Sequence, residues 1–328
     1  MKAIIRTKAG KEFSTMKVQD ISSVKSTENE VKIKMSSSRI NPVDMDLMKG
    51  MPFLKYKNPQ IGGIDGAGTI IEIGKNVTNF KIGDNVFFYR LFTDIGSWAN
   101  EITINEKYIA KIPNNTTVIQ AGAVALPLLT AYDSLMQMNT KPNEKILIHG
   151  AGGGVGFQAV QIAKQMNLYV IATASDSDIS ILEQAGVNKI INYKNQQFEQ
   201  LLNQSDVDYV FDVLGDDTLL KSIALKPKKI VSLKYIQPEN MYKAGMNLPG
   251  ILKWIMKLTM KKFDKAAKQN NVQLIGQVTG ADGKLLQKAS DTISKMNYIN
   301  RNFPTLAISD IENKGLSKSD IGNIILFQ

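Results

Sequence analysis

The sequence predicts an α/β protein in which a doubly wound parallel sheet is joined to a second, mostly β module. Two observations predict the parallel sheet: a glycine cluster links a short apolar run to a helical pattern, and further strands and helices alternate after Lys145. A third observation predicts the second module, because short apolar runs separated by glycines fill the chain before Pro113.

The chain up to Pro113 has the pattern of a compact antiparallel module. Val31, Ile33 and Met35 alternate with two lysines, and glycines interrupt the other short apolar runs. Such alternation is typical of a strand with one buried face. Residues 121–138 instead have helical periodicity, so we expect the β module to end near Pro113.

The glycine cluster lies between an apolar run at 146–148 and a helical pattern that begins near Val155. The glycines are Gly150, Gly152, Gly153, Gly154 and Gly156. Ala151, Gly153 and Gly156 have the spacing A-x-G-x-x-G, a variant of the dinucleotide fingerprint. Glycines at such a turn let the backbone approach a pyrophosphate, and the helix offers its first N–H groups to the anion. The turn therefore predicts a dinucleotide site.

The alternation continues beyond the glycine turn. We expect strands at 169–173, 189–191, 209–213 and 230–233, and helices near 155–166, 179–184, 197–203 and 218–223. Ligands of such sheets bind at the carboxyl ends of the strands. The residues at those ends are Thr173, Ala174, Ser175, Leu214, Gly215 and Ser232. We expect a bound nucleotide to contact several of them.

Residues 238–268 interrupt the series with a basic amphipathic pattern. Its apolar positions are Ile251, Leu252, Ile255, Met256 and Phe263, and its opposite positions are Lys253, Lys257, Lys261 and Lys268. Such a helix can contact a membrane surface or a partner. Because apolar stripes more often pack on their own protein, we expect this one to do so. Further strands are predicted at 272–278 and 323–327.

The composition excludes several classes of site. The chain has no cysteine and a single histidine, His149, so disulfides, cysteine zinc sites and Cys/His nucleophilic pairs are excluded. We expect His149 to be a packed, hydrogen-bonded residue at a strand end. The net charge of +10 is compatible with nucleic acid, anionic membranes or phosphorylated ligands, but we expect a lysine-rich solvated surface. With no secretory or membrane-spanning pattern, a cytoplasmic location is expected.

Several ordered motifs give the chain a resemblance to a known family. They are NPVDMDLMKG at 41–50, IGGIDGAGTIIEIGKNVTNFKIGDNVFF at 61–88, ALPLLTAYDSL at 125–135, the glycine turn, INYK at 191–194 and FDVLGDDTL at 211–219. Over nearly its whole length the chain resembles the zinc-independent quinone oxidoreductase, or zeta-crystallin-like, branch of the medium-chain dehydrogenase/reductase superfamily.

The resemblance implies two domains. Residues 1–113 and 281–328 would form a GroES-like catalytic domain, and residues 114–280 a Rossmann domain with the doubly wound parallel sheet. It also implies an active site in the cleft between the domains and a homodimer formed through an edge strand, here 272–278.

The resemblance also implies roles for individual residues. Asn41 would lie beside the nicotinamide and the substrate, Asp44 would order the loop of Asn41, and Thr130 would contact the carboxamide. Many relatives have a tyrosine where this chain has Asp46, which leaves the substrate class open. The residues implied to bind the cofactor, besides Thr130, are Ala151, Gly152, Gly153, Gly154, Val155, Ala174, Ser175, Tyr193, Leu214, Gly215 and Ser232.

The end of the second strand of the predicted parallel sheet, at 169–173, bears on the choice between NADPH and NADH. An acidic residue there would hold the ribose hydroxyls and repel a 2′-phosphate, but its usual place is occupied by Ala174. Ser175 and Tyr193 match positions on the phosphate side of NADPH-using relatives. Asp176, where some relatives have a lysine, disfavours the phosphate. We expect NADPH, with NADH possible.

Three functions stay open at this point. The first is a zinc-independent transfer of hydride from NADPH to a quinone or another conjugated carbonyl. The second is the reduction of an enoyl or alkenal double bond, which the pocket at 41–54 and the segment 238–268 would decide. The third, from another class, is a cofactor-binding RNA or membrane-surface protein with weak catalysis, which the basic charge suggests.

Overall fold

The computed structural model describes residues 1–6, 16–49, 60–94 and 96–327. The chain divides into two compact units. The first, called here the β-rich unit, comprises Met1–Leu126, Ala244–Met246 and Gly280–Gln328; the second, the α/β unit, comprises Pro127–Lys243 and Asn247–Thr279. The structure thus assigns residues 114–126 to the β-rich unit, whereas the boundary predicted from sequence lies at 113.

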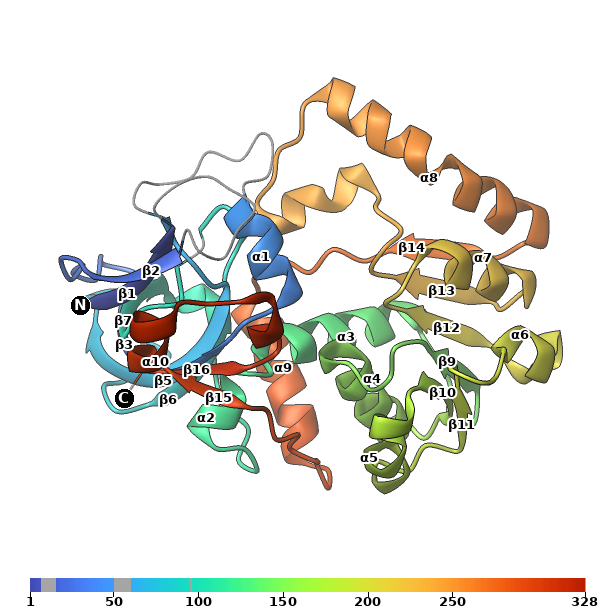
Figure 1. Cartoon of the computed structure of the whole chain (residues 1–328), viewed down its shortest axis with the longest axis horizontal. Coiled ribbons are helices and arrows are strands. Elements are labelled where there is room, and N and C mark those ends of the chain that lie inside the picture. Colours follow the sequence, from blue (N-terminus) through green and yellow to red (C-terminus); the bar gives the residue numbers. More distant parts are fainter. Residues whose placement is uncertain (7–15, 50–59, 95, 328) are drawn as a thin grey trace. The chain divides into compact units, whose positions relative to one another are not determined.

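The β-rich unit contains two sheets (Figure 1). The larger has the order β15-β16-β3-β5-β6-β8, with β7 paired to β3, and the smaller has the order β2-β1-β4. The strands are β1 (Lys2–Arg6), β2 (Met16–Asp20), β3 (Glu30–Arg39), β4 (Gln60–Ile61), β5 (Asp65–Ile73), β6 (Asn85–Tyr89), β7 (Glu101–Asn105), β8 (Ile109–Lys111), β15 (Thr305–Ala307) and β16 (Ile324–Leu326). Because β16 pairs antiparallel with β3, the end of the chain completes a sheet begun near its start.

Close packing in this unit depends on glycine at particular places. A side chain at Gly68 on β5 would place its Cβ 2.1 Å from the carbonyl oxygen of Lys34 on β3. Around these strands lies one cluster of buried aliphatic and aromatic side chains, among them Ile33, Phe88 and Trp98. The helices of the unit are α1 (Pro42–Lys49), α2 (Val118–Ala121), α9 (Gly283–Ser294) and α10 (Ile308–Lys314).

The α/β unit is built on a parallel sheet with the order β11-β10-β9-β12-β13-β14. Its strands are β9 (Lys145–Ile148), β10 (Tyr169–Ala174), β11 (Lys189–Asn192), β12 (Tyr209–Asp212), β13 (Lys229–Ser232) and β14 (Gln273–Gly276). The chain starts at β9, moves outward to β11, and then returns to β12 and continues to β14. The sheet is therefore doubly wound, with its switch point between β9 and β12, which confirms the predicted fold class.

Helices connect these strands. They are α3 (Ala125–Met138), which begins at the boundary of the units, α4 (Gly154–Gln165), α5 (Ile179–Gln184), α6 (Phe198–Leu201), α7 (Asp216–Ala224) and α8 (Gly250–Asn270). Along the described ranges, no helix combines the length and the apolar character needed to cross a bilayer.

The segment 238–268 consists of a 3₁₀ helix, η5 (Pro238–Ala244), followed by the long helix α8. The expectation that its apolar stripe packs on its own protein is wrong for two of the named positions, since Ile251 and Ile255 are 66% and 46% exposed. Phe263 is buried in the core of the unit, and Leu252 and Met256 are partly buried. Each residue turns the helix by about 100°, so Ile251 and Ile255 point away from the face that Phe263 buries.

Candidate functional site

In the β-rich unit, Asn41 lies at the junction of β3 and α1. Its backbone N–H donates to Asp44 Oδ2 at 2.7 Å, and the N–H of Asp44 donates back to the carbonyl oxygen of Asn41 at 3.0 Å. Pro42 occupies the first helical position, where its missing N–H and fixed φ suit the start of a helix. The bond to the Asp44 side chain is one half of a capping box, and together with the backbone bond it fixes the loop that carries Asn41.

A second carboxyl group holds the side chain of Asn41. Its Nδ2 donates to Asp65 Oδ1 at 2.9 Å, and the other oxygen of Asp65 accepts from the N–H of Leu126 at 3.3 Å. Asn41, Asp44 and Asp65 are 4%, 1% and 0% exposed. The Asn41 amide is thus fixed between two carboxyl groups that are shielded from water.

Burial changes the acidity of this group, called here the carboxyl pair (Asp44 and Asp65). Loss of hydration raises the pKa of Asp44 well above its ordinary value, and the neighbouring Asp65 raises it further. Burial also raises the pKa of Asp65 to about 7, although hydrogen bonds from Asn41 and Leu126 and the charge of Arg39 act in the opposite direction. The pair can therefore hold a proton at neutral pH.

Two other side chains surround the pair. The pKa of the Tyr89 phenol is raised by its burial and by both carboxyl groups, so Tyr89 stays protonated. The guanidinium of Arg39 lies 4.1 Å from the centre of the Phe303 ring and donates to the carbonyl oxygen of Ala123 at 3.4 Å. Arg39 therefore supplies a positive charge that is largely removed from water.

Sequence reasoning did not single out Asp65. The available signal was an acidic residue in GGIDGAG, between Ile64 and glycines that permit close strand packing. A charged side chain at the start of a buried strand needs a specific reason, because burying it costs free energy.

Asp46, which stands where many relatives have a tyrosine, is exposed on α1. The predicted pocket at 41–54 lies partly outside the described residues, which stop at Lys49 and resume at Gln60.

In the α/β unit, the glycine turn has the geometry that its sequence predicts. Gly150 has a φ of +65°, and a Cβ at Gly156 would lie 2.2 Å from the carbonyl oxygen of Gly150. The N–H of Ala151 donates to the carbonyl oxygen of Thr173 at 3.2 Å, which joins the turn to β10. Helix α4 begins at Gly154, directly after the turn. Residues 151–155 therefore present a helix N-terminus at the carboxyl end of the sheet.

The end of β12 is organised by Asp212, which sequence reasoning also missed. Its carboxylate accepts from the N–H groups of Leu214 and Gly215, each at 3.0 Å, and from the Ser232 hydroxyl at 2.6 Å. Gly215 has a φ of +78°, a conformation that side chains rarely adopt. Asp212 thus brings together Leu214, Gly215 and Ser232, three of the predicted cofactor residues.

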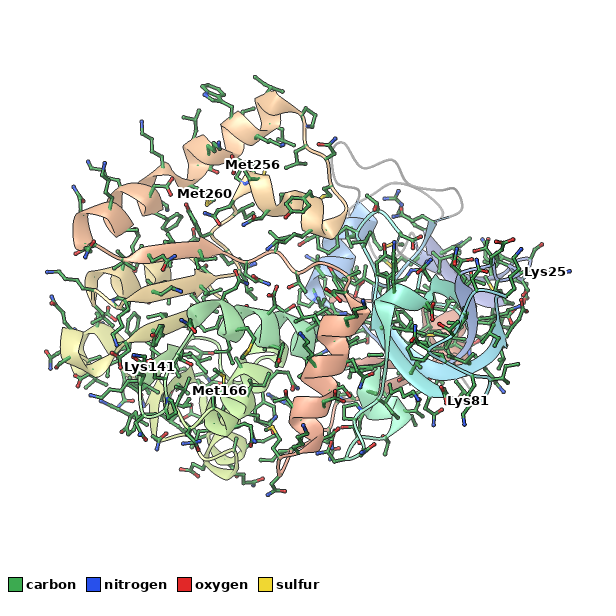
Figure 2. The ribbon with its side chains drawn as sticks, turned by 180° about the vertical axis from the view of Figure 1, so that it is seen from behind. Lys25, Lys81, Lys141, Met166, Met256 and Met260 are labelled. Atoms are coloured by element: carbon green, nitrogen blue, oxygen red, sulfur yellow. The ribbon has the colours of Figure 1, made fainter. Side chains whose placement is uncertain are left out.

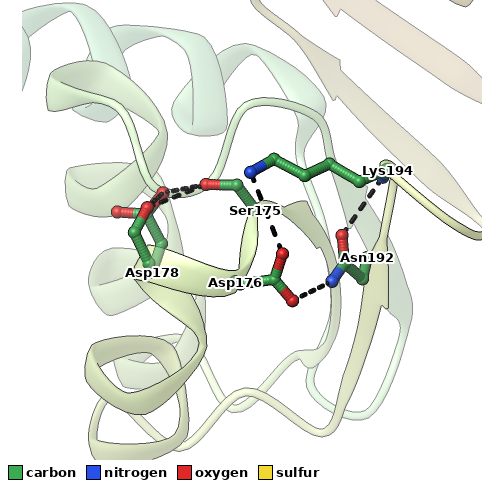
Figure 3. Close-up of polar contacts among 6 residues, drawn as sticks. Ser175, Asp176, Asp178, Asn192 and Lys194 are labelled. Atoms are coloured by element: carbon green, nitrogen blue, oxygen red, sulfur yellow. Dashed lines mark hydrogen bonds and ion pairs between the residues drawn. The ribbon is translucent and has the colours of Figure 1, made fainter.

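The loop after β10 carries the acidic residues that bear on cofactor choice (Figure 3). Asp176 accepts from Asn192 Nδ2 at 2.5 Å, and its second oxygen lies 3.8 Å from Lys194 Nζ. The Ser175 hydroxyl donates to Asp178 at 2.9 Å. A Cβ at Gly152 would lie 2.2 Å from the Asp178 carboxyl carbon. Asp178 therefore packs directly against the glycine turn.

The remaining predicted cofactor residues differ in exposure. Ala174 is buried at the end of β10, while Tyr193 is largely exposed. A cavity of about 220 Å³ is lined by Thr173 and Tyr193 together with polar groups of α7. Thr130 on α3 is buried, and its hydroxyl accepts from Thr279 at 2.9 Å. Thr130 therefore belongs to a buried polar group within the α/β unit.

His149 is a packed residue, as its place at a strand end indicated. Its Nδ1 lies 3.1 Å from the Thr173 hydroxyl and its Nε2 lies 2.9 Å from the Ser222 hydroxyl. The Phe198 ring contacts it edge-on, with 4.6 Å between ring centres. Burial lowers the pKa of His149 to about 4, so the imidazole is neutral at pH 7.

With this geometry established, comparisons with known proteins define the class. Residues 27–114 match the alcohol dehydrogenase GroES-like domain, and residues 154–228 match the domain described as zinc-binding dehydrogenase. Both matches support the predicted resemblance to the medium-chain dehydrogenase/reductase superfamily.

Individual relatives refine this assignment. The chain is 34% identical over 189 residues to a chloroplast envelope quinone oxidoreductase homologue of Arabidopsis thaliana, covering 55% of this chain and 57% of that protein. It is 28% identical to the mitochondrial enoyl-[acyl-carrier-protein] reductase of Xenopus tropicalis, over 56% of this chain and 52% of that protein. The chain thus spans less than two thirds of the length of the curated relatives that it matches.

Solved structures match over the whole chain. The quinone oxidoreductase of Coxiella burnetii is 25% identical with a TM-score of 0.80, and 99% of each chain is covered. The quinone oxidoreductase of Escherichia coli, solved with NADPH, is 20% identical with a TM-score of 0.74, covering 99% of this chain and 100% of that one. The predicted resemblance to the quinone oxidoreductase branch is confirmed by these relatives.

The zinc in the name of the second domain does not fit the residues of this chain. There is no cysteine, and the single histidine is buried and bonded to Thr173 and Ser222. Among the described residues, no three His, Asp or Glu side chains are placed to hold a metal ion. The ligands that zinc prefers in catalytic sites are thus not supplied.

The carboxyl pair makes the stability of the protein depend on pH. The folded-state pKa of Asp65, about 7, lies above its ordinary value of 3.8. The folded state therefore binds this proton more tightly, and its stabilising effect is lost as the pH rises from 4 toward 7. In the Asp65→Asn variant, the free energy of unfolding should fall less over that range. Urea unfolding at several pH values measures the difference. Asp46→Asn, exposed on α1, is the control, and parallel profiles for Asp65→Asn and wild type would contradict the assignment.

Removing the Asp212 carboxylate leaves two backbone N–H groups and one hydroxyl without their acceptor. We expect Asp212→Ala to lower the free energy of unfolding by about 3 kcal/mol, because buried donors would lose their partner. Asp212→Asn keeps one oxygen and should lose less. Urea unfolding compares both with Asp217→Ala, in which the removed carboxylate is mostly exposed. Equal stability of Asp212→Ala and Asp217→Ala would show that Asp212 does not organise the site.

Proposed function

We propose that the protein is a zinc-independent oxidoreductase that transfers hydride from NADPH to a quinone or another conjugated carbonyl. The observation that carries the proposal is the glycine turn at the carboxyl end of a doubly wound parallel sheet, with Asp212 fixing the adjacent loops. That arrangement suits a dinucleotide pyrophosphate. The named relatives, which are quinone oxidoreductases, support the same chemistry.

Residues of the chain fit a nicotinamide dinucleotide. Gly156 leaves room for the turn because a Cβ there would collide with Gly150. Residues 151–155 would hold the pyrophosphate, and Leu214, Gly215 and Ser232 would line the nicotinamide half, with Thr130 near the carboxamide. When bound, the cofactor supplies the hydride, and the protein's part is to orient it and to stabilise charge on the acceptor.

In the absence of a zinc ligand set, hydrogen-bond donors must stabilise the carbonyl oxygen of the substrate. We assign this role to Asn41, whose amide is held by Asp65 and whose backbone is held by Asp44. Reduction of a quinone to a hydroquinone takes one hydride and one proton. Because the carboxyl pair can retain a proton at neutral pH, it is a suitable reservoir for that proton.

A panel of electron acceptors tests the proposal. NADPH oxidation is followed with ortho- and para-quinones, enones and alkenals, and we expect the quinones to be reduced. Asn41→Ala should lower kcat/KM about 100-fold, the usual cost of removing one such donor. Asp20→Asn, at an exposed position of β2 in the same unit, provides the control. If the wild type reduces no member of the panel, the enzymatic assignment fails; if Asn41→Ala is as active as wild type, only the role of Asn41 fails.

The choice of NADPH rests on the loop after β10. Asp176 and Asp178 are unfavourable to a 2′-phosphate, but Asp176 is already bound to Asn192 and lies beside Lys194. Some relatives have a lysine at the position of Asp176. In this chain Lys194, which is exposed and follows Tyr193, can supply the positive charge that attracts the 2′-phosphate. We therefore propose NADPH, with NADH as the alternative.

Substitutions on either side of this ion pair test the choice of cofactor. Lys194→Ala should lower the ratio of kcat/KM for NADPH to that for NADH about fivefold, the effect of losing about 1 kcal/mol of exposed electrostatic attraction. Asp176→Lys should raise the ratio. Steady-state kinetics with both nucleotides measures it, and Lys141→Ala on the same unit is the control. A wild type that clearly prefers NADH would overturn the choice.

The second candidate is the reduction of an enoyl or alkenal double bond. The similarity to a protein named as an enoyl-[acyl-carrier-protein] reductase favours it, and the chemistry of hydride addition to a conjugated system is the same. In the acceptor panel, faster turnover of enones and alkenals than of quinones would support this candidate. The homodimer formed through β14, an edge of the described sheet, and the cytoplasmic location stay predictions.

A further inference from the structure

Helix α8 presents an apolar face that is exposed in the described part of the structure. Ile251, Trp254, Ile255 and Leu258 are 66%, 58%, 46% and 47% exposed. Their spacing of three and four residues places all four on one side of the first two turns. Single exposed apolar residues are common on proteins, but a contiguous stripe of this kind marks an interaction surface.

The opposite side of α8 fixes the helix to the α/β unit. Phe263 and Ala267 are buried in the core of that unit, and Met260 packs against the same core. Figure 2 places Met256 and Met260 on the side of α8 that faces the other helices of its unit. The hydroxyl of Tyr235 donates to Asp264, which ties the middle of the helix to the loop after β13. The exposed stripe is therefore held outward by packing on the other side.

The charge on α8 is almost all positive. The helix contains six lysines and one acidic residue, Asp264. Lys257 is paired with Glu239. Within the part of the chain that the structure describes, no ion pair is formed by Lys261, Lys265 or Lys268, and all three are exposed. An apolar first half thus adjoins a second half with unneutralised positive charge.

We propose that α8 binds the surface of a membrane that contains anionic lipids. The stripe from Ile251 to Leu258 would lie among the upper acyl chains, while Lys261, Lys265 and Lys268 contact the lipid phosphates. Trp254 suits the boundary between headgroups and hydrocarbon, where tryptophan is enriched in membrane proteins. In this arrangement α8 lies on the bilayer and does not cross it, because its lysines would be costly to bury among the acyl chains.

Two other occupants suit this surface less well. In a symmetric dimer the apolar halves of two α8 helices would meet, but Lys261, Lys265 and Lys268 of both copies would gain no negative partner. Nucleic acid would satisfy the lysines, but its backbone cannot cover Ile251, Ile255 and Leu258 with apolar groups. An anionic lipid surface satisfies both halves of the helix together.

The two tryptophans of the chain make the proposal directly measurable. Trp98 is fully buried in the β-rich unit, whereas Trp254 is 58% exposed. We expect a blue shift of the intrinsic fluorescence when the full-length protein is titrated with vesicles of phosphatidylcholine and phosphatidylglycerol in equal parts. Vesicles of phosphatidylcholine alone should bind much more weakly. The shift should be absent in Trp254→Phe, while co-sedimentation of that variant with the vesicles continues.

Variants separate the two halves of the surface. Lys261→Gln with Lys265→Gln should weaken co-sedimentation about 25-fold, since each lysine near an anionic surface contributes about fivefold. Ile255→Glu with Leu258→Glu should weaken it at least about 100-fold, because burial of each apolar side chain contributes about tenfold or more. All four positions are exposed, so folding should be unaffected, and circular dichroism checks this.

Matched controls come from the β-rich unit. Lys25→Gln with Lys81→Gln removes two exposed lysines from its periphery (Figure 2), and Ile82→Glu changes an apolar residue that is 61% exposed. Neither should alter vesicle binding by more than about twofold. Equal weakening by the controls would overturn the proposal, as would absence of binding to anionic vesicles near physiological salt.

Two further measurements identify a different occupant. Light scattering that detects a dimer abolished by Ile255→Glu with Leu258→Glu would assign the face to a second copy of the chain. A blue shift of Trp254 with single-stranded RNA, and none with vesicles, would assign it to nucleic acid. Either result overturns the lipid proposal. The proposal does not depend on the acceptor, because vesicle binding is measured without any substrate or cofactor.

Discussion

The burial of two carboxyl groups beside Asn41 is the constraint on which the β-rich unit depends. Removing Asp44 and Asp65 from water costs free energy, and hydrogen bonds from Asn41, Leu126 and the backbone of Ile64 and Arg39, together with the charge of Arg39, offset part of that cost. An aliphatic pair would be the more stable choice at these positions. Their presence is explained if the site must hold an amide in one orientation and keep a proton beside it.

The α/β unit uses a carboxylate in a different way. Asp212 is as deeply buried as Asp65, but it is surrounded by three donors, two from the backbone and one from Ser232. Asp212 draws together the loops that follow two strands, whereas the two members of the carboxyl pair lie side by side and each disfavours the charge of the other. The two units thus use the same functional group for positioning in one case and for acidity in the other. The chain has no cysteine and its single histidine is packed, so under the proposed function these buried carboxyl groups would support the chemistry that metal ligands support in zinc enzymes.

The surface of α8 connects the proposed reduction of quinones with a place where it would occur. Quinones with long apolar tails reside in membranes, and an enzyme held at a lipid surface would meet them there. The lysines of α8 account for part of the net charge of +10, which the composition alone could not assign to any function. A solvated lysine surface explains the other lysines adequately.

The sequence by itself determined the doubly wound sheet, the glycine turn and the absence of a cysteine-based zinc site, because these follow from local periodicity, from the conformational freedom of glycine and from composition. Asp65 and Asp212 were not recognised, since their partners, Leu126 and Ser232, are distant in the sequence. Only the tertiary structure decided which side of α8 is covered. Helical periodicity defines two faces of a helix, but the packing of Phe263 and Ala267 on the α/β unit decides which residues remain outside.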